Sequence, residues 1–87
     1  MLTNKRSDEA ARELADWAKE ISLTVDKEIT VDVRDDYPDS NTYLIRLAKG
    51  ARVLLFRLSY GQAHTDGREV ECERAVRRKI KDLWNLI

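Results

Sequence analysis

Residues 43–60 read YLIRLAKGARVLLFRLSY, and this stretch decides the fold. Two apolar runs flank Lys49-Gly50, and a glycine-containing two-residue turn between such runs predicts a β-hairpin. With Lys49-Gly50 as the loop, we expect Ile45 to lie opposite Leu54 on one face of the hairpin. The opposite face is expected to carry Leu44, Arg46, Val53, Leu55 and Arg57.

This second face breaks the usual pattern of a hairpin that is covered on one side. Such a hairpin should alternate apolar and polar side chains, but Leu44, Val53 and Leu55 stand where water is expected. An apolar centre with Arg46 and Arg57 at its rim is typical of an interaction patch. The pattern therefore predicts a protein partner, either a different protein or a second copy of the chain. The alternative is that three surface aliphatic residues have no function.

Helical periodicity surrounds the hairpin on both sides. After Ser7, the expected N-cap, an apolar stripe at helical spacing predicts a first helix. Its members are Ala10, Leu14, Trp17, Ala18 and Ile21. From Thr24 to Arg34 the period changes to two, which indicates a half-buried strand that points Val25, Ile29, Val31 and Val33 to one side.

A second helix is expected after a loop over residues 61–65. Asp66 and Glu69 have the spacing of a capping box at its start. Its apolar stripe comprises Cys72, Val76, Ile80, Leu83, Trp84 and Ile87. The order α-β-β-β-α predicts an α+β fold in which a three-stranded antiparallel meander carries two helices packed on one face. The order of the strands within the sheet is left open.

Composition limits the class of protein. The 87 residues are expected to form a single domain, residues 1–87. A hydrophobic fraction of 43% with 37% charged residues predicts a folded globule rather than a disordered chain. One cysteine excludes an internal disulfide, and the sequence has neither a signal peptide nor a membrane-spanning run, so a cytoplasmic location is expected.

The net charge of zero hides an asymmetry along the chain. Residues 1–40 hold six Lys or Arg against eleven Asp or Glu, whereas residues 41–87 hold ten against five. A basic half can indicate an acidic partner. The alternative is that the two halves neutralise each other in the folded protein, since neighbouring surface charges need no external partner.

No residue pattern predicts catalysis or a cofactor. His64 and Cys72 can in principle form a nucleophilic pair, but Cys72 falls on an apolar stripe, where cysteine behaves as a small hydrophobic residue. The three glycines stand apart and form no phosphate-binding loop. The oxygen donors of the loop before the hairpin lack the spacing of a calcium loop and read as turn formers. These donors are Asp35, Asp36, Asp39 and Asn41.

Nucleic-acid binding is the alternative function. The element order resembles that of the double-stranded-RNA-binding domain, whose members contact RNA phosphates at the start of the last helix. Here that segment reads Asp66-Gly67-Arg68-Glu69-Val70-Glu71, which is acidic on balance, so the resemblance implies topology alone. The cations that remain for such a role are Arg46, Arg52, Arg57, Arg74, Arg77, Arg78 and Lys81. The function we expect first is a small non-catalytic binding protein, regulatory or inhibitory in character.

Overall fold

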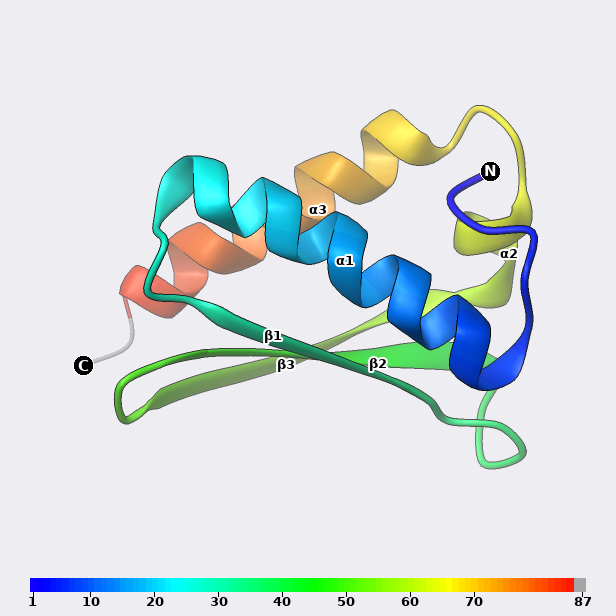
Figure 1. The fold of residues 1–87 in the computed structure, drawn as a ribbon, viewed down its shortest axis with the longest axis horizontal. Helices are drawn as coiled ribbons and strands as arrows, with labels where there is room; N and C mark the ends of the chain where they lie inside the picture. Colours follow the sequence, from blue (N-terminus) through cyan, green and yellow to red (C-terminus); the bar gives the residue numbers. More distant parts are fainter. Residues whose placement is uncertain (86–87) are drawn as a thin grey trace.

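The computed structural model describes residues 1–85 as one layer of helices on one face of a sheet (Figure 1). Its elements are α1 (Ser7–Val25), β1 (Thr30–Asp35), β2 (Thr42–Lys49), β3 (Arg52–Ser59), α2 (Tyr60–His64) and α3 (Glu69–Trp84). The expected α+β fold, with an antiparallel meander and two helices on one face, is confirmed. One correction concerns the segment expected as a loop, most of which forms α2.

The sheet has the order β1-β2-β3 with antiparallel neighbours, so β2 is the central strand. The expected register of the hairpin is wrong by two residues. Ile45 pairs with Phe56 instead of Leu54, and the loop is Gly50-Ala51. Gly50 has φ of +60°, which a two-residue hairpin turn requires at its first position and which glycine adopts without strain. A shift of two residues leaves every side chain on its predicted face.

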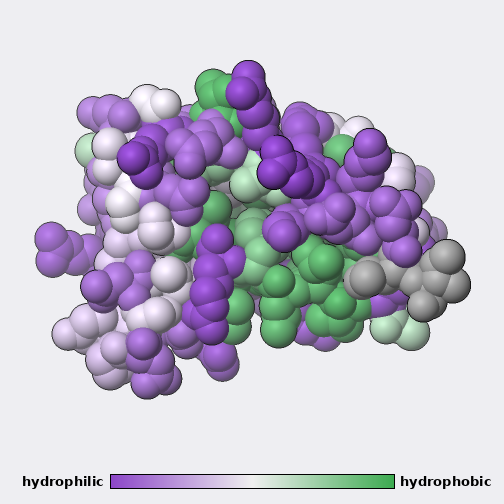
Figure 2. All heavy atoms as spheres, turned by 180° about the vertical axis from the view of Figure 1, so that it is seen from behind, coloured by the Kyte–Doolittle hydropathy of each residue, from purple (hydrophilic) through white to green (hydrophobic). Residues whose placement is uncertain are grey.

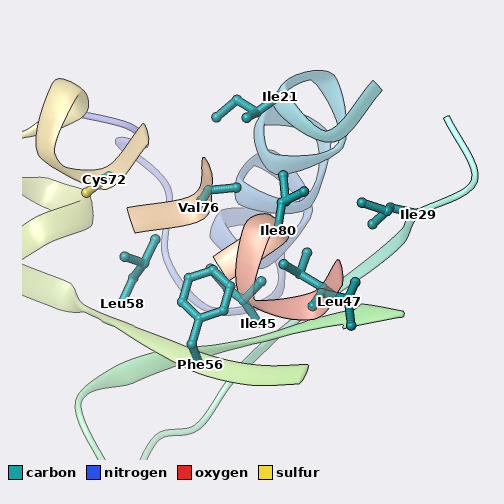
Figure 3. Close-up of a cluster of buried hydrophobic side chains, with 10 residues drawn as sticks. Ile21, Ile29, Ile45, Leu47, Phe56, Leu58, Cys72, Val76 and Ile80 are labelled. Atoms are coloured by element: carbon teal, nitrogen blue, oxygen red, sulfur yellow. The ribbon is translucent and has the colours of Figure 1, made fainter. Parts of the chain in front are cut away.

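The core lies between the inner face of the sheet and the two long helices. Figure 3 shows Ile45, Leu47, Phe56 and Leu58 projecting from the strands into this space. The predicted helical stripes are confirmed at their buried positions, which are Ala10, Leu14, Ala18 and Ile21 of α1 and Cys72, Val76, Ile80 and Leu83 of α3. Trp84 is an exception, because 42% of it is exposed and its ring lies beneath the Lys49 ammonium. Ile87, the last expected member, lies outside the described residues.

The junction of α1 and β1 also differs from expectation. The helix continues to Val25, which is exposed rather than on the inner side of a strand. The strand begins only at Thr30. Between them, the Asp26 carboxylate accepts a hydrogen bond from the backbone N–H of Glu28 at 2.9 Å. This local turn redirects the chain, which is a typical role for aspartate.

The expected caps are not formed. Ser7 is the first residue of α1, and the N-cap Arg6 makes no side-chain cap bond. Asp66 and Glu69 both accept hydrogen bonds from the amino group of Met1 instead of capping α3. The capping box of this region is formed by Ser59 and Gln62 at the start of α2.

The charge asymmetry along the chain places acidic and basic residues on different sides of the folded protein. The acidic residues 1–40 contribute α1 and the edge strand β1 that it covers, whereas the basic residues 41–87 contribute β2, β3 and α3 (Figure 1). Ion pairs between the two halves, such as that of Lys49 with Asp26, neutralise part of it. Within residues 1–85, no helix combines the length and the apolar character that crossing a membrane requires.

Candidate functional site: the open face of the sheet

The face of the sheet that points away from α1 and α3 is the candidate site, and we call it the open face. Its side chains form a regular lattice because cross-strand partners share a face. The rows are Thr30, Ala48 and Val53; then Asp32, Arg46 and Leu55; then Arg34, Leu44 and Arg57. The five residues predicted for partner binding therefore lie together on the neighbouring strands β2 and β3.

Apolar side chains are exposed on the open face. The exposed fraction is 43% for Val53 and 57% for Leu55, and Leu44 is half-buried. Leu44 and Leu55 line a shallow depression of about 300 Å³ together with charged residues of β1 and β2. Figure 2 shows a hydrophobic area below the hydrophilic surface of α3, on the side of the molecule where β3 runs. No element within residues 1–85 covers the open face, because both long helices pack on the other side.

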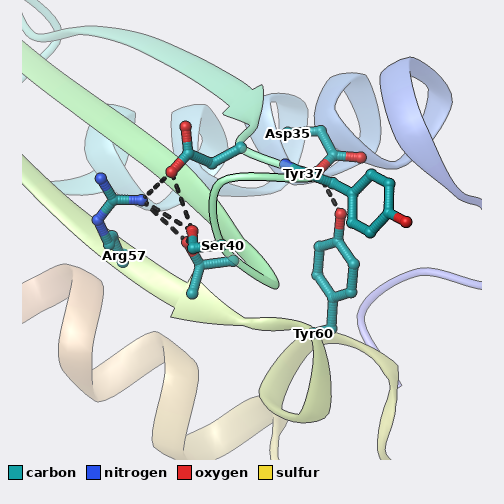
Figure 4. A network of polar contacts seen from close by, with 7 residues as sticks. Asp35, Tyr37, Ser40, Arg57 and Tyr60 are labelled. Atoms are coloured by element: carbon teal, nitrogen blue, oxygen red, sulfur yellow. Dashed lines mark hydrogen bonds and ion pairs between the residues drawn. The ribbon is translucent and has the colours of Figure 1, made fainter.

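The arginines of the open face are held by polar contacts within the chain. Arg46 forms an ion pair with Asp32 at 3.4 Å, and both side chains are exposed, so the pair is weak and sensitive to salt. Arg57 is fixed more firmly, since it donates hydrogen bonds to Thr42 at 3.0 Å and to Asp36 (Figure 4). The guanidinium of Arg57 lowers the pKa of the Asp36 carboxyl.

Strand β3 is an edge of the sheet and differs from the other edge. Natural edge strands are protected by shortness, by charges, by proline or by bulges. The edge strand β1 is short and exposes alternating polar and charged side chains. By contrast, β3 pairs over all eight of its residues without a bulge, and its only charged residues are Arg52 and Arg57. Its outer backbone is therefore open to pairing with another strand.

The cations predicted for nucleic-acid binding do not form one surface. Arg46 and Arg57 belong to the open face, whereas Arg74, Arg77, Arg78 and Lys81 lie on α3 in the helical layer. Arg52, at the hairpin end, donates a hydrogen bond to the carbonyl of Trp84 at 3.1 Å. Arg77 pairs with Glu73 at 3.6 Å, as its i,i+4 spacing predicts.

The residues considered for catalysis or metal binding in the sequence do not converge on one site either. The thiol of Cys72 is buried and contacts the carbonyl of Gln62 at 3.7 Å. Both ring nitrogens of His64 are engaged elsewhere, one by the hydroxyl of Tyr43 and the other by a backbone carbonyl. Asp35 and Asp36 are bound to Tyr60 and Arg57, so the acidic loop does not focus its carboxylates on one point.

The sequence analysis missed a cleft of about 840 Å³ at the end of the sheet where α1 begins. All three tyrosines of the chain line it, together with Asp35, His64 and Arg6. These residues come from four separate segments, so no local spacing in the sequence predicts the cleft.

A comparison of the chain with protein-family models, curated proteins and solved structures found no match in any of the three.

Proposed function

We propose that this chain is a small, cytoplasmic, non-catalytic binding protein, regulatory or inhibitory in character, that engages another protein through the open face and the β3 edge. The observation that carries the proposal is the exposure of Val53 and Leu55 on a long edge strand that has neither a proline nor a bulge. An edge of this kind promotes aggregation unless a partner occupies it. A specific partner that covers this edge would explain why Val53 and Leu55 are exposed.

The chemistry of the open face favours an extended, acidic segment as the occupant. A strand that pairs with β3 places alternate side chains beside Leu55, where apolar groups are buried on binding. Leu44 is flanked in its row by Arg34 and Arg57. Carboxylates between the apolar positions of the partner complement these cations.

A second copy of the chain fits this surface less well. Strand β3 reads RVLLFRLS and contains two arginines and no acidic residue. A second β3 strand therefore brings no carboxylate to complement Arg46 and Arg57, whereas an acidic segment does. We therefore assign the surface to a different protein.

The test compares leucine-to-serine variants of the open face with one variant on α1. Leu55→Ser, alone and combined with Leu44→Ser, removes the apolar centre of the open face. Leu23→Ser is the matched control, because Leu23 is 50% exposed on α1. Partners are captured by photo-crosslinking from position 53, identified, purified and measured by titration calorimetry, while thermal unfolding reports stability.

We expect the purified partner to bind the wild type and Leu23→Ser alike and to bind Leu55→Ser at least about tenfold more weakly, a loss of about 1.4 kcal/mol. Stability should change little. Equal binding to all variants would exclude the open face. Unfolding of the Leu44→Ser and Leu55→Ser double variant would show that this face is part of the core. Analytical ultracentrifugation of the wild type tests the second copy, since a stable dimer would replace the hetero-partner.

Nucleic-acid binding is supported by one observation, the exposure of Arg74, Arg78 and Lys81 along α3 without an ion pair to any described residue. It predicts affinity for short duplexes that falls steeply with salt concentration. An NMR titration with duplex DNA and RNA at two salt concentrations tests this. Shifts on α3 that vanish with salt would make nucleic acid the preferred partner, and a flat titration would remove it.

A further inference from the structure

The tyrosine cleft is independent of the open face and has the build of a small-molecule site. Its volume of about 840 Å³ lies within the range of ligand pockets. The start of α1, the end of β1, strand β2 and helix α2 all contribute to its wall. Since residues from four segments converge here, the cleft is positioned by the folded core rather than by one mobile loop.

The hydroxyl groups of the two inner tyrosines are used within the protein. Tyr60 donates its hydroxyl hydrogen bond to Asp35 (Figure 4). The Tyr43 hydroxyl lies 2.6 Å from Nε2 of His64, and Nδ1 of His64 lies 3.0 Å from the Thr3 carbonyl. Because that carbonyl can only accept, Nδ1 carries a proton, and in a neutral imidazole Nε2 then accepts the hydrogen bond from the Tyr43 hydroxyl. These tyrosines therefore present ring surface rather than free hydroxyl groups to the cleft.

Asp35 is the fixed negative charge of the cleft. One of its oxygens accepts hydrogen bonds from the Tyr60 hydroxyl and, at 3.0 Å, from the backbone N–H of Tyr37. Its second oxygen accepts no hydrogen bond from the described residues. Figure 4 shows the Tyr37 ring beside the contact between Tyr60 and Asp35. A carboxylate next to tyrosine rings is the arrangement that attracts an organic cation.

A positive region lies on the same cleft. Arg6 lines it, is exposed and pairs with no carboxylate of residues 1–85. Helix α1 begins at the next residue, Ser7, and the free backbone N–H groups at the start of a helix favour an anion. Burial is the main cause that raises the pKa of Tyr43, and the charge of Asp35 raises it further while that of Arg6 lowers it. A bare cation or a bare anion would be repelled by one of the two groups.

We propose that the tyrosine cleft binds a small zwitterion, with its ammonium group against Asp35 and the rings of Tyr37 and Tyr60, and its anionic group toward Arg6. The shared chemistry is an ammonium group a few bonds away from a carboxylate or a phosphate. Ring faces attract the ammonium group electrostatically. The guanidinium of Arg6 can bind either anionic group through two hydrogen bonds.

Three probes separate the two charges in NMR titrations of labelled protein: phosphocholine carries both charges, choline carries only the cation, and inorganic phosphate carries only the anion. We expect phosphocholine to bind about tenfold or more tightly than either of the others, with shifts at Asp35, Tyr37 and Arg6. Equal affinity for choline and phosphocholine would refute the zwitterion, and so would the absence of saturable shifts with all three probes in the millimolar range.

Two variants test the assignment of each charge. Asp35→Asn keeps one acceptor oxygen, Oδ1, which is the atom that accepts from both Tyr37 and Tyr60, and it should weaken the binding of phosphocholine and choline but not of phosphate. Arg6→Ala should weaken the binding of phosphocholine and phosphate but not of choline, and Arg12→Ala, on α1, is its control. If Asp35→Asn loses its fold, Tyr37→Ala replaces it, since Tyr37 is 67% exposed. Unchanged phosphocholine affinity in the folded variants would overturn the proposal. Leu55→Ser should leave this binding intact, which separates the cleft from the open face.

Discussion

Two leucines of strand β3 provide a direct test of the assignment of its two faces. Leu58 is 1% exposed in the core, whereas Leu55 is 57% exposed on the open face. Truncation of a buried leucine to alanine costs about 2–5 kcal/mol, because the lost apolar contact and the cavity both contribute. A domain of this size has a total stability of about 5–10 kcal/mol. Leu58→Ala should therefore remove a large part of the free energy of unfolding.

The same substitution at Leu55 should cost less than about 1 kcal/mol, since more than half of the side chain already contacts water. For a chain of this length, each kcal/mol lowers Tm by about 4–8 °C. Leu58→Ala should thus lower Tm by more than about 10 °C and Leu55→Ala by a few degrees at most. Urea unfolding followed by tryptophan fluorescence and thermal unfolding followed by circular dichroism measure both values. Equal destabilisation by the two variants would show that the open face is covered. A larger loss for Leu55→Ala than for Leu58→Ala would show that the two faces of the sheet are assigned the wrong way round.

Three further outcomes follow from single contacts. The Arg57 guanidinium holds the pKa of the Asp36 carboxyl below its ordinary value of 3.8. The pair therefore contributes its full stability above pH 3.8 and loses it as the pH falls through the lowered pKa of Asp36 in the folded protein. Urea unfolding across the acid range should show this loss, and Asp36→Asn should reduce the slope; an unchanged slope would contradict the pair. Burial raises the pKa of the Cys72 thiol, so iodoacetamide should label it only as the protein unfolds, and rapid labelling of the native protein would show that the thiol is accessible. Tyr43→Phe leaves Nε2 of His64 without its donor and should lower the free energy of unfolding by about 1–3 kcal/mol, whereas a neutral result would mean that the hydrogen bond is not formed in solution.

The open face was predictable because it depends only on alternation along two neighbouring strands. Leu44, Val53 and Leu55 have the parity that places them opposite the core, and an error of two residues in register preserves parity. The error itself arose because either Lys49-Gly50 or Gly50-Ala51 satisfies a glycine-containing turn. In the structure Gly50 takes the first position of the turn, where both common types of two-residue hairpin turn require a positive φ.

The helix ends and the cleft were beyond local reasoning for a different reason. Valine suits a strand, yet Val25 is helical because α1 continues to the turn at Asp26. The cleft needs contacts across large separations in sequence, such as that of Tyr60 with Asp35. Propensity and periodicity describe neighbours in the chain, so they do not show which distant side chains the packing of four elements brings together.

The lateral separation of charge affects how this molecule behaves among its own copies. Its sequence pI is about 6.6, so near neutral pH no net repulsion keeps molecules apart. The acidic side formed by α1 and β1 can then attract the basic side of a neighbouring molecule over distances comparable to the Debye length, which is about 30 Å in 0.01 M salt and about 8 Å at physiological ionic strength. The molecule is an electric dipole, and dilute buffer should promote head-to-tail association and precipitation that added salt reverses. The same dipole orients the β3 side toward an approaching acidic chain, so salt should slow the formation of that complex more than it speeds its dissociation.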